Sequence, residues 1–460
     1  MTVVYAGRVI TWSVALALSS GRILCATSRQ AQRDSVDEWI RNYMEEKHVP
    51  GLALGVLHGG RIVKAQGYGF ANLEQRTPVS PETVFESASA GKQFTAAAVL
   101  LLVQDGKLGL DDPIAKYLPG TPDAWRAITI RHLLTHTSGI PDYEADSTLN
   151  LRLDYSEDEL LKRFAAYPLL FSPGTEWSYS NSGYVALGMI IRHVTGAHWG
   201  QFMRQRIFEP LDMQATRTIT YDEIVLNRAA GYRVVDGQLR NRELVGPGWN
   251  TTADGSLFFT VVDLAKWDAA LYRATPLSDS AKRLMWSPTR LTDGSTASYG
   301  LGWQVVDTPG HRCAEHSGSG WGFRTYIGRF LDDSLTVIVL ANATTIDPVE
   351  VGHHVAALFR PALGPPRRVA IHLSREALNE YVGTYRLPTG ETLRVSRSDS
   401  GLTVQGDIPL GPVVPEARDV FFNPAWREGR VVFIRDDRGA VRWLGLRRYP
   451  SSPTRARRVS

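Results

Sequence analysis

Cysteine is scarce in this chain, since only Cys25 and Cys313 occur among 460 residues. Two cysteines cannot form the dense disulfide framework that stabilises small secreted domains, so a fold of that class is excluded. Histidine is sparse as well, and the pair His132 and His136, spaced four apart, has no intervening glutamate and no third ligand nearby. We therefore expect neither a metal nor another cofactor.

A large excess of one charge is also missing. The chain has 51 Lys and Arg against 47 Asp and Glu, which gives a formal net charge of +4. Arginine is scattered except at residues 455–458, which we interpret as a solvated end because short charge runs are typical of exposed tails. Without a basic face, no nucleic-acid partner is expected.

Long hydrophobic runs are few. Residues 9–18, behind Arg8, are too short to span a bilayer but suit the core of a secretory signal. We interpret residues 1–30 as a signal segment and predict export to the periplasm or the exterior. A cytoplasmic location stays open because no clean cleavage site follows. No stable membrane span is expected, and Leu24 before Cys25 argues against a lipid anchor.

The composition, with 43% hydrophobic and 21% charged residues, is typical of a soluble globular protein with more than one domain. Residues 361–368 form a proline-rich linker. We predict a main domain over 35–360, a linker over 361–374 and a small antiparallel β domain over 375–450. The β-prone runs of this last domain are residues 391–395, 402–405, 420–422, 431–434 and 441–446.

The first chemical pattern is Ser89, three residues before Lys92, at the start of an apolar segment of strong helix formers. Helical spacing of i and i+3 places the two side chains on one face, with Cβ atoms about 5–6 Å apart. A lysine made partly neutral by burial can take the hydroxyl proton and so activate the serine as a nucleophile. The alternative for Ser-x-x-Lys alone is a helix-capping serine followed by a surface lysine.

A second pattern pairs Tyr179 with Asn181 in a loop before another apolar helix. A phenol beside an ammonium has a lowered pKa, so Tyr179 next to Lys92 is a candidate general base. The alternative is a buried tyrosine that hydrogen-bonds locally and an asparagine that caps the helix.

The third pattern is His316-Ser317-Gly318, followed by the apolar strand at residues 335–341. Glycines in an edge strand let a ligand backbone approach closely. The backbone N–H of Ser319 is a candidate oxyanion donor opposite that of Ser89. His316 offers hydrogen bonds and a charge that titrates near neutral pH. The same segment also fits a plain glycine-rich hairpin.

In this order the three segments resemble the serine β-lactamase and penicillin-binding-protein superfamily, in its class C-like branch of D,D-peptidases, D-aminopeptidases and esterases. The resemblance spans about residues 35–360 and includes the stretches 67–73, 130–142 and 252–257. It implies an α/β (α+β) fold, with an antiparallel sheet flanked by helices and a helical lobe. The roles it implies are acylation of Ser89, proton sharing by Lys92 and Tyr179, substrate positioning by Asn181, and an oxyanion hole from the N–H groups of Ser89 and Ser319.

One departure from the superfamily concerns substrate charge. Where its β-lactamases carry lysine, this chain has His316, so a fixed positive charge for a substrate carboxylate is missing. The departure favours peptide or ester substrates over a dedicated β-lactamase, although Arg324 nearby is a candidate replacement. Residues 381–385 are similar to the start of the lipocalin-like domains that follow some of these catalytic domains.

We therefore predict a serine hydrolase that acts through an acyl-enzyme on a small peptide of D-amino-acid type or an ester. The predicted catalytic residues are Ser89, Lys92 and Tyr179, and the predicted substrate-binding residues are Asn181, His316, Gly318 and Ser319. The alternatives are a β-lactamase, a catalytically silent relative that binds cell-wall peptides, and a non-hydrolytic acyltransferase or cyclase that uses the same serine. Substrate stereochemistry and oligomeric state are not predicted.

Overall fold

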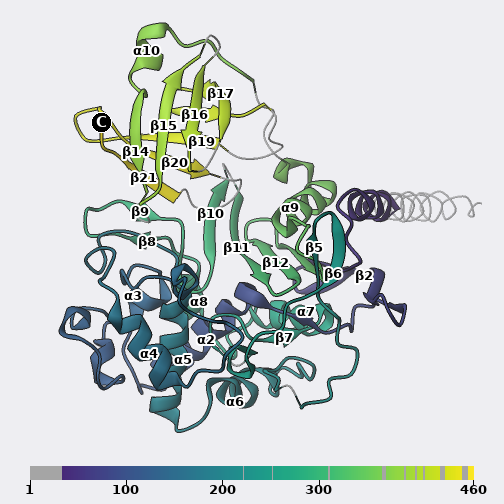
Figure 1. The fold of residues 1–460 in the computed structure, drawn as a ribbon. Helices are drawn as coiled ribbons and strands as arrows, with labels where there is room; N and C mark the ends of the chain where they lie inside the picture. The colour runs from purple at the N-terminus through teal and green to yellow at the C-terminus, as the bar shows by residue number, and fades with distance from the viewer. Residues whose placement is uncertain are drawn as a thin grey trace, which may run out of the picture.

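The computed structural model describes residues 34–460 except 221, 251, 309–310, 365–368, 388–389, 399–400, 408–409, 425–429 and 448–453. The fold has two parts, a mixed α/β body around an antiparallel sheet and a separate β barrel built by the last strands (Figure 1). The predicted signal segment and the middle of the predicted linker lie outside the described residues. Over the described part of the chain, no helix has the length and apolar character that crossing a membrane requires.

The body is built on a seven-stranded antiparallel sheet in the order β10-β11-β12-β13-β1-β2-β3. Leu52 of β1 pairs with Tyr68 on one side and Ala341 on the other. A tight turn at Gly59 and Gly60 joins β1 to β2, and both glycines have the positive φ that such a turn requires, 57° and 74°. The strands are β1 (Gly51–His58), β2 (Arg61–Asn72), β3 (Thr77–Pro78), β10 (Gln304–Thr308), β11 (His311–Gly320), β12 (Phe323–Phe330) and β13 (Leu335–Ala341).

Helices cover both faces of the sheet. Residues 34–46 form a helix that packs with α9 (Pro348–Phe359) on one face, where Val36, Ile40 and Val351 are buried in a shared cluster. β1 is buried along all but its last residue, as a continuous apolar run in the middle of a covered sheet predicts.

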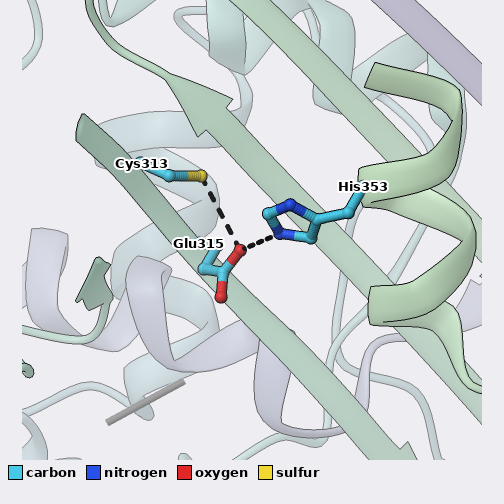
Figure 2. Close-up of side chains that lie close together, drawn as sticks. All are labelled: Cys313, Glu315 and His353. Carbon is cyan, nitrogen blue, oxygen red and sulfur yellow. Dashed lines mark hydrogen bonds and ion pairs between the residues drawn. The ribbon is translucent and has the colours of Figure 1, made fainter. Parts of the chain in front are cut away.

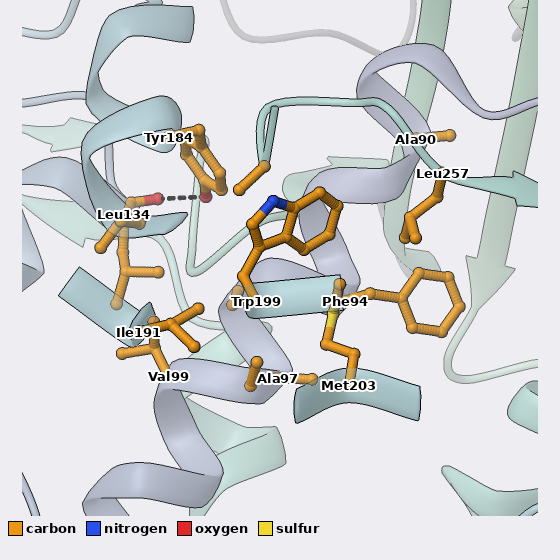
Figure 3. Close-up of a cluster of buried hydrophobic side chains, with 14 of the residues drawn as sticks. Ala90, Phe94, Ala97, Val99, Leu134, Tyr184, Ile191, Trp199, Met203 and Leu257 are labelled. Carbon is orange, nitrogen blue, oxygen red and sulfur yellow. Dashed lines mark hydrogen bonds between the residues drawn. The ribbon is translucent and has the colours of Figure 1, made fainter. Parts of the chain in front are cut away.

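The helical lobe covers the other face. Residues 92–102 of its central helix, α2, are all buried, so this helix is packed against neighbours on every side. Phe94, Trp199 and Met203 belong to the buried cluster around it, and the Tyr184 hydroxyl donates a 2.8 Å hydrogen bond to the Leu134 carbonyl (Figure 3). The lobe helices are α2 (Lys92–Gln104), α3 (Ile130–Leu134), α4 (Glu157–Ala166), α5 (Asn181–Thr195), α6 (Trp199–Met203), α7 (Val261–Ala270) and α8 (Asp279–Met285).

Short elements connect these layers. The single-turn helices are η1 (Ala88–Gly91), η2 (Ile114–Lys116), η3 (Asp123–Trp125), η4 (Tyr143–Ala145), η5 (Arg204–Phe208), η6 (Pro247–Asn250) and η7 (Pro361–Leu363). The short strand pairs are β4 (Phe85–Glu86) with β7 (Phe258–Phe259), β5 (Tyr232–Val235) with β6 (Gln238–Asn241), and β8 (Thr289–Arg290) with β9 (Thr296–Ala297).

Eight antiparallel strands close the C-terminal barrel after the short helix α10 (Arg375–Asn379). Tyr381, Tyr385, Phe421 and Phe433 pack in its core. The strands are β14 (Gly383–Arg386), β15 (Thr392–Arg397), β16 (Leu402–Gly406), β17 (Gly411–Ala417), β18 (Val420–Phe422), β19 (Arg430–Arg435), β20 (Val441–Arg447) and β21 (Thr454–Arg458). The predicted fold class, a sheet flanked by helices followed by a small all-β domain, is confirmed.

The arginine-rich end corrects one prediction. Residues 454–458 form β21, which pairs with β14 and β20 and buries Ala456 fully, so residues 455–458 are not a solvated tail. The strand lies beyond residue 450, where we placed the end of this domain. The sequence did not predict this strand, because Ala456 is its only apolar residue and arginines surround it.

Candidate active site

Ser89 lies in η1, a tight turn where the lobe meets the sheet, and so precedes α2 instead of belonging to it. Ala88 has a φ of 45°, a left-handed conformation that residues other than glycine rarely adopt. The turn is fixed from two sides. Thr325 of β12 donates a 2.6 Å hydrogen bond to the Ser87 carbonyl, and the Ser87 hydroxyl donates a 2.7 Å bond to the Gly255 carbonyl. These contacts stabilise the strained turn that presents Ser89.

Lys92 is the nearest basic group to this serine. Its Nζ lies 3.0 Å from Ser89 Oγ, and the residue is fully buried. Nζ also donates to Asn181 Oδ1 at 2.7 Å and to the Asp254 backbone carbonyl, so three acceptors match the three N–H donors of an ammonium. Burial lowers the pKa of Lys92 to about 8, although nearby carboxylates, Asp254 first, oppose the shift. A lysine with this pKa is partly neutral near neutral pH and can then accept the serine proton.

Tyr179 lies beside this pair, with Lys92 Nζ 4.9 Å from its ring centroid. Its hydroxyl is buried and forms no hydrogen bond of standard geometry with the described residues. Burial raises the pKa of Tyr179 well above that of free tyrosine. An interaction with Ser89 lowers it, but Asp142 and Asp254 raise it further. The predicted lowering of this pKa by Lys92 is therefore wrong, because desolvation and two carboxylates outweigh one ammonium. At rest Tyr179 is a neutral phenol and a proton donor.

Asn181 begins α5 and links Lys92 to a carboxylate. Its backbone N–H and its side-chain Nδ2 each donate to Asp142 Oδ2 at 3.1 Å, while Oδ1 accepts from Lys92. The helix cap is Ser180, whose hydroxyl accepts a 3.2 Å hydrogen bond from the Gly183 N–H. Asn181 thus orients the lysine instead of capping the helix, and its contact with substrate stays a prediction.

His316 lies on β11 as a neutral imidazole. Its Nδ1 is 2.6 Å from the Ser317 carbonyl, which can only accept, so Nδ1 carries the proton and Nε2 accepts from the Tyr299 hydroxyl at 2.9 Å. Burial first, and then the charge of Lys92, lower the pKa of His316 to about 3. The expectation of a charge that titrates near neutral pH is therefore wrong, since the ring is enclosed and faces a cation.

Gly318 lets β11 lie against the turn that carries Ser89. A methyl group there would overlap the Ser87 carbonyl oxygen and the Thr325 hydroxyl oxygen, so this close approach requires glycine. β10 pairs with β11 only as far as Glu315, which leaves the edge at 316–320 without a partner among the described strands. An extended substrate could pair with this edge. The oxyanion role of the Ser319 N–H stays a prediction.

Arg324 pairs with Ser319 across β11 and β12. Its guanidinium donates to the carbonyls of Gly320 and Phe323 at 3.2 and 2.9 Å, so it is held at the end of the strand. Its proposed replacement of the missing lysine charge gains no support from these contacts.

Comparison with known proteins identifies the family. The family model described as Beta-lactamase matches residues 36–359, which include the whole sheet. The chain belongs to the β-lactamase family. Penicillin-binding protein 4* of Bacillus subtilis (strain 168) is 31% identical over 405 residues, or 82% of this chain and 88% of that protein. The D-aminopeptidase of Brucella ovis is 30% identical over 301 residues, which cover 64% of this β-lactamase-family chain and 56% of that protein.

Solved structures support the same assignment. An octameric penicillin-binding protein homologue from Pyrococcus abyssi superimposes with a TM-score of 0.64 at 25% identity, over 91% of this chain and 99% of that one. A penicillin-binding protein from Bacillus halodurans superimposes with a TM-score of 0.62 at 28% identity, over 69% of this chain and 98% of that one. The predicted resemblance is confirmed, and these relatives support a serine hydrolase of the penicillin-binding-protein and D-aminopeptidase type.

His136 is a residue of this β-lactamase-family site whose role the sequence analysis missed. Its carbonyl accepts from the Ser178 N–H at 3.0 Å, and its Nδ1 accepts from the Ser180 N–H at 3.1 Å. Its ring lies against the Tyr179 ring, with centroids 4.2 Å apart. Burial, followed by the charge of Lys92, lowers the pKa of His136 well below its usual value, so Nδ1 stays an acceptor. His136 therefore fixes both neighbours of Tyr179. Its only signal in the sequence was its place in the stretch 130–142.

Three carboxylates near Lys92 were also missed. Asp142, Glu144 and Asp254 all act electrostatically on its ammonium. The Tyr143 hydroxyl donates to Asp254 Oδ2 at 2.7 Å, while Asp254 Oδ1 is buried and has no hydrogen-bond partner in the described structure. Burial, then repulsion from Asp142 and Asp254, raises the pKa of Glu144 to about 7. Asp142 and Asp254 belong to stretches that carry the family resemblance, but nothing in those stretches shows that they meet at Lys92.

A cavity of about 200 Å³ adjoins these acids, and Asp142, Tyr143, Phe164 and Ser182 are among its lining residues. A larger cavity of about 620 Å³ lies around α6 and η5, and none of the predicted catalytic residues lines it. None of the predicted catalytic residues lines the smaller cavity either, but its lining residue Asp142 is connected through Asn181 to Lys92.

Proposed function

We propose that this chain is a serine hydrolase that forms an acyl-enzyme on Ser89 and cleaves peptide bonds of D-amino-acid type or esters. The observation that supports it most is the 3.0 Å contact between Lys92 Nζ and Ser89 Oγ in a pocket that lowers the pKa of Lys92 to about 8. A capping serine followed by a surface lysine would show neither the contact nor the burial.

Acylation begins when neutral Lys92 takes the Ser89 proton and Oγ attacks the substrate carbonyl carbon. The oxyanion accepts hydrogen bonds from the backbone N–H groups of Ser89 and Ser319, and each such donor typically lowers the barrier by about 3 kcal/mol. Tyr179, as a neutral phenol, gives its proton to the departing amine or alkoxide and regains one from the Lys92 ammonium. Lys92 is then neutral again, and the acyl group is esterified to Ser89.

Deacylation repeats these steps with water as the nucleophile. Neutral Lys92 accepts a proton from the attacking water, directly or through Tyr179, and the ester bond to Ser89 breaks. The proton returns to Ser89 Oγ as the carboxylic acid product leaves. The same lysine therefore serves as base in both halves of the cycle.

The charges around the site favour substrates without a free carboxylate. His316 is neutral, and Arg324, although charged, donates from one guanidinium nitrogen to carbonyls of its own hairpin. Asp142, Glu144 and Asp254 add carboxyl groups near Lys92. Esters, amides and peptides with a free amine fit this pattern better than carboxylate-bearing β-lactams, in keeping with the D-aminopeptidase among the relatives.

Intact-mass analysis after treatment with a fluorophosphonate tests the proposal. We expect one adduct on the wild-type chain and none on Ser89→Ala, with loss of hydrolysis of an activated ester in the same variant. A panel of D-amino-acid amides, short esters and a chromogenic β-lactam then ranks the substrates. Absence of an adduct on the folded wild type would support the silent peptide-binding alternative instead.

A further inference from the structure

The face of β11 turned away from the lobe holds three side chains of metal-ligating type. Cys313 and Glu315 lie two residues apart on this strand, and His353 reaches them from α9 (Figure 2). Their exposures are 0%, 1% and 1%, so all three lie in the core between the sheet and the helix. His316 and Gly318 alternate with them along β11, which places the candidate active site on the opposite face.

The three side chains converge on one point. Their ligand atoms all lie within 4.8 Å of one another. Glu315 Oε2 is 3.7 Å from Cys313 Sγ and 2.8 Å from His353 Nε2. The hydroxyl of Tyr326 on β12 adds a fourth polar atom, 2.9 Å from Glu315 Oε2 and 3.1 Å from His353 Nε2.

Glu315 has an unmet requirement in this arrangement. Its second oxygen, Oε1, is buried and has no hydrogen-bond partner in the part of the chain that the structure describes. An unpaired carboxylate oxygen in an apolar core is costly, and buried charges are normally paired or coordinate a metal. A cation between these side chains would bind Oε2, the oxygen that Cys313, Tyr326 and His353 contact, and would balance the charge of the buried carboxylate.

The surrounding sequence makes room for the cluster. A methyl group at Gly328 or at Gly352 would overlap the Tyr326 ring or hydroxyl, so both glycines are needed where Tyr326 reaches Glu315. One glycine is on β12 and the other on α9. The two elements that carry Tyr326 and His353 can therefore approach β11 closely enough to bring four polar groups together.

We propose that Cys313, Glu315 and His353 bind one divalent transition-metal ion, with Zn²⁺ as the best match to the ligands. Thiolate, imidazole and carboxylate are the three ligand types of protein zinc sites, whereas Mg²⁺ and Ca²⁺ prefer oxygen alone. Uptake of Zn²⁺ displaces the thiol proton of Cys313 to solvent. The burial of all three residues makes the site structural, an attachment of α9 to the strand that carries His316. The proposal departs from our expectation of no metal and does not depend on the proposed hydrolase activity.

Metal analysis of the full chain tests the site. After expression in zinc-supplemented medium and desalting, we expect about one zinc per wild-type chain by mass spectrometry. Cys313→Ser and His353→Gln should each lose most of it. His354→Gln is the matched control, since the neighbouring imidazole stacks on Trp39 with centroids 3.9 Å apart and lies outside the cluster. Zinc that persists in both cluster variants would place the metal elsewhere and overturn the assignment.

Expression in cobalt-supplemented medium gives a second measurement that needs no variant to fold. A cobalt ion bound at Cys313 should show a thiolate-to-metal charge-transfer absorption and the visible bands of a low-coordinate site. Folded wild-type protein that carries no zinc in the first medium and shows no charge-transfer band in the second would mean that the cluster is a hydrogen-bonded network only, and the proposal would fail.

Discussion

Burial shifts the pKa values of Lys92 and Tyr179, the two residues that we propose exchange the Ser89 proton, in opposite directions. Removal from water disfavours the charged form of any group, so it lowers the pKa of the Lys92 amine and raises that of the Tyr179 phenol. These opposite shifts support the two separate roles that we propose, with Lys92 as the base and Tyr179 as the acid that protonates the leaving group.

Acylation should follow the titration of Lys92. Only the neutral amine accepts the serine proton, so the acylation rate of a neutral ester should rise with pH and level off above about 8, the pKa of Lys92. Two pH units below that value about 1% of the lysine is neutral, so the rate should be about 100-fold lower. Stopped-flow measurement of acylation between pH 6 and 9 checks this, with Lys92→Gln expected to lose the profile together with the activity. A flat profile in the wild type would contradict the assignment.

His316 should contribute no inflection of its own to the pH dependence. Its pKa of about 3 keeps the ring neutral throughout the working range, so His316→Gln should lower kcat/KM by a constant factor from about pH 5 to 8. The measurement is the ratio of kcat/KM for the two proteins at each pH. If this ratio changes near pH 6.5, the charged imidazolium that we expected from the sequence is supported instead.

At the scale of elements, the loop that carries Tyr179 depends on a contact from a distant segment. His136→Phe keeps a ring against Tyr179 but removes the acceptor of the Ser180 N–H. Because a displacement of about 1 Å at a reacting group can cost about 100-fold in rate, we expect kcat to fall by up to this factor with little change in KM.

The matched control for this loop is His132→Phe, which removes the 3.2 Å hydrogen bond from the Thr129 N–H to the His132 ring at α3. Comparing kcat and KM of the two variants separates a specific effect on Tyr179 from general loss of stability. Equal losses of kcat in both variants would count against a positioning role for His136.

The strand β11 allows a second test at this scale. Gly318→Ala should push the strand away from the Ser89 turn, because the added methyl overlaps the Ser87 carbonyl, and ester hydrolysis should fall by at least about 100-fold if an oxyanion donor is lost. Ser319→Ala keeps the same backbone N–H and should stay close to wild type. A larger loss of kcat/KM in Ser319→Ala than in Gly318→Ala would show that the Ser319 hydroxyl, and not its backbone N–H, takes part in the reaction.

Local patterns predicted those elements whose signal lies within one segment. The β1–β2 hairpin, α2 and α5 follow from apolar periodicity and from glycine or serine at their ends. β17 was missed because Pro412 and Pro415 argue against a strand, and β21 because arginine conceals its inward face. Ser89, Lys92, Tyr179 and Asn181 were found by spacing and do meet. The hydrogen bond from the Ser180 N–H to His136 was not predicted, since 44 residues separate the two in the sequence.

At the scale of the whole molecule, the barrel has a hydrophobic core of its own. The Bacillus halodurans structure is matched over 98% of its length by only 69% of this chain, about the share that the family match at residues 36–359 occupies. We predict that a chain ending at residue 364 still folds and still reacts with a fluorophosphonate at Ser89. Intact mass and thermal unfolding of both chains check this, and failure of the folded short chain to label would assign the barrel a part in catalysis.

The central place of β1 in the sheet has a consequence for biosynthesis. β1 and β2 leave the ribosome early, but the second neighbour of β1 is β13, and Leu52 must wait for Ala341 before that edge is closed. Until then a strand that is apolar except for His58 offers unpaired N–H and C=O groups, the kind of edge that pairs with the wrong chain. Such long-range pairing is slow to form. A nascent chain stalled between these two strands is therefore the species most exposed to aggregation, and the one that a chaperone has most reason to hold.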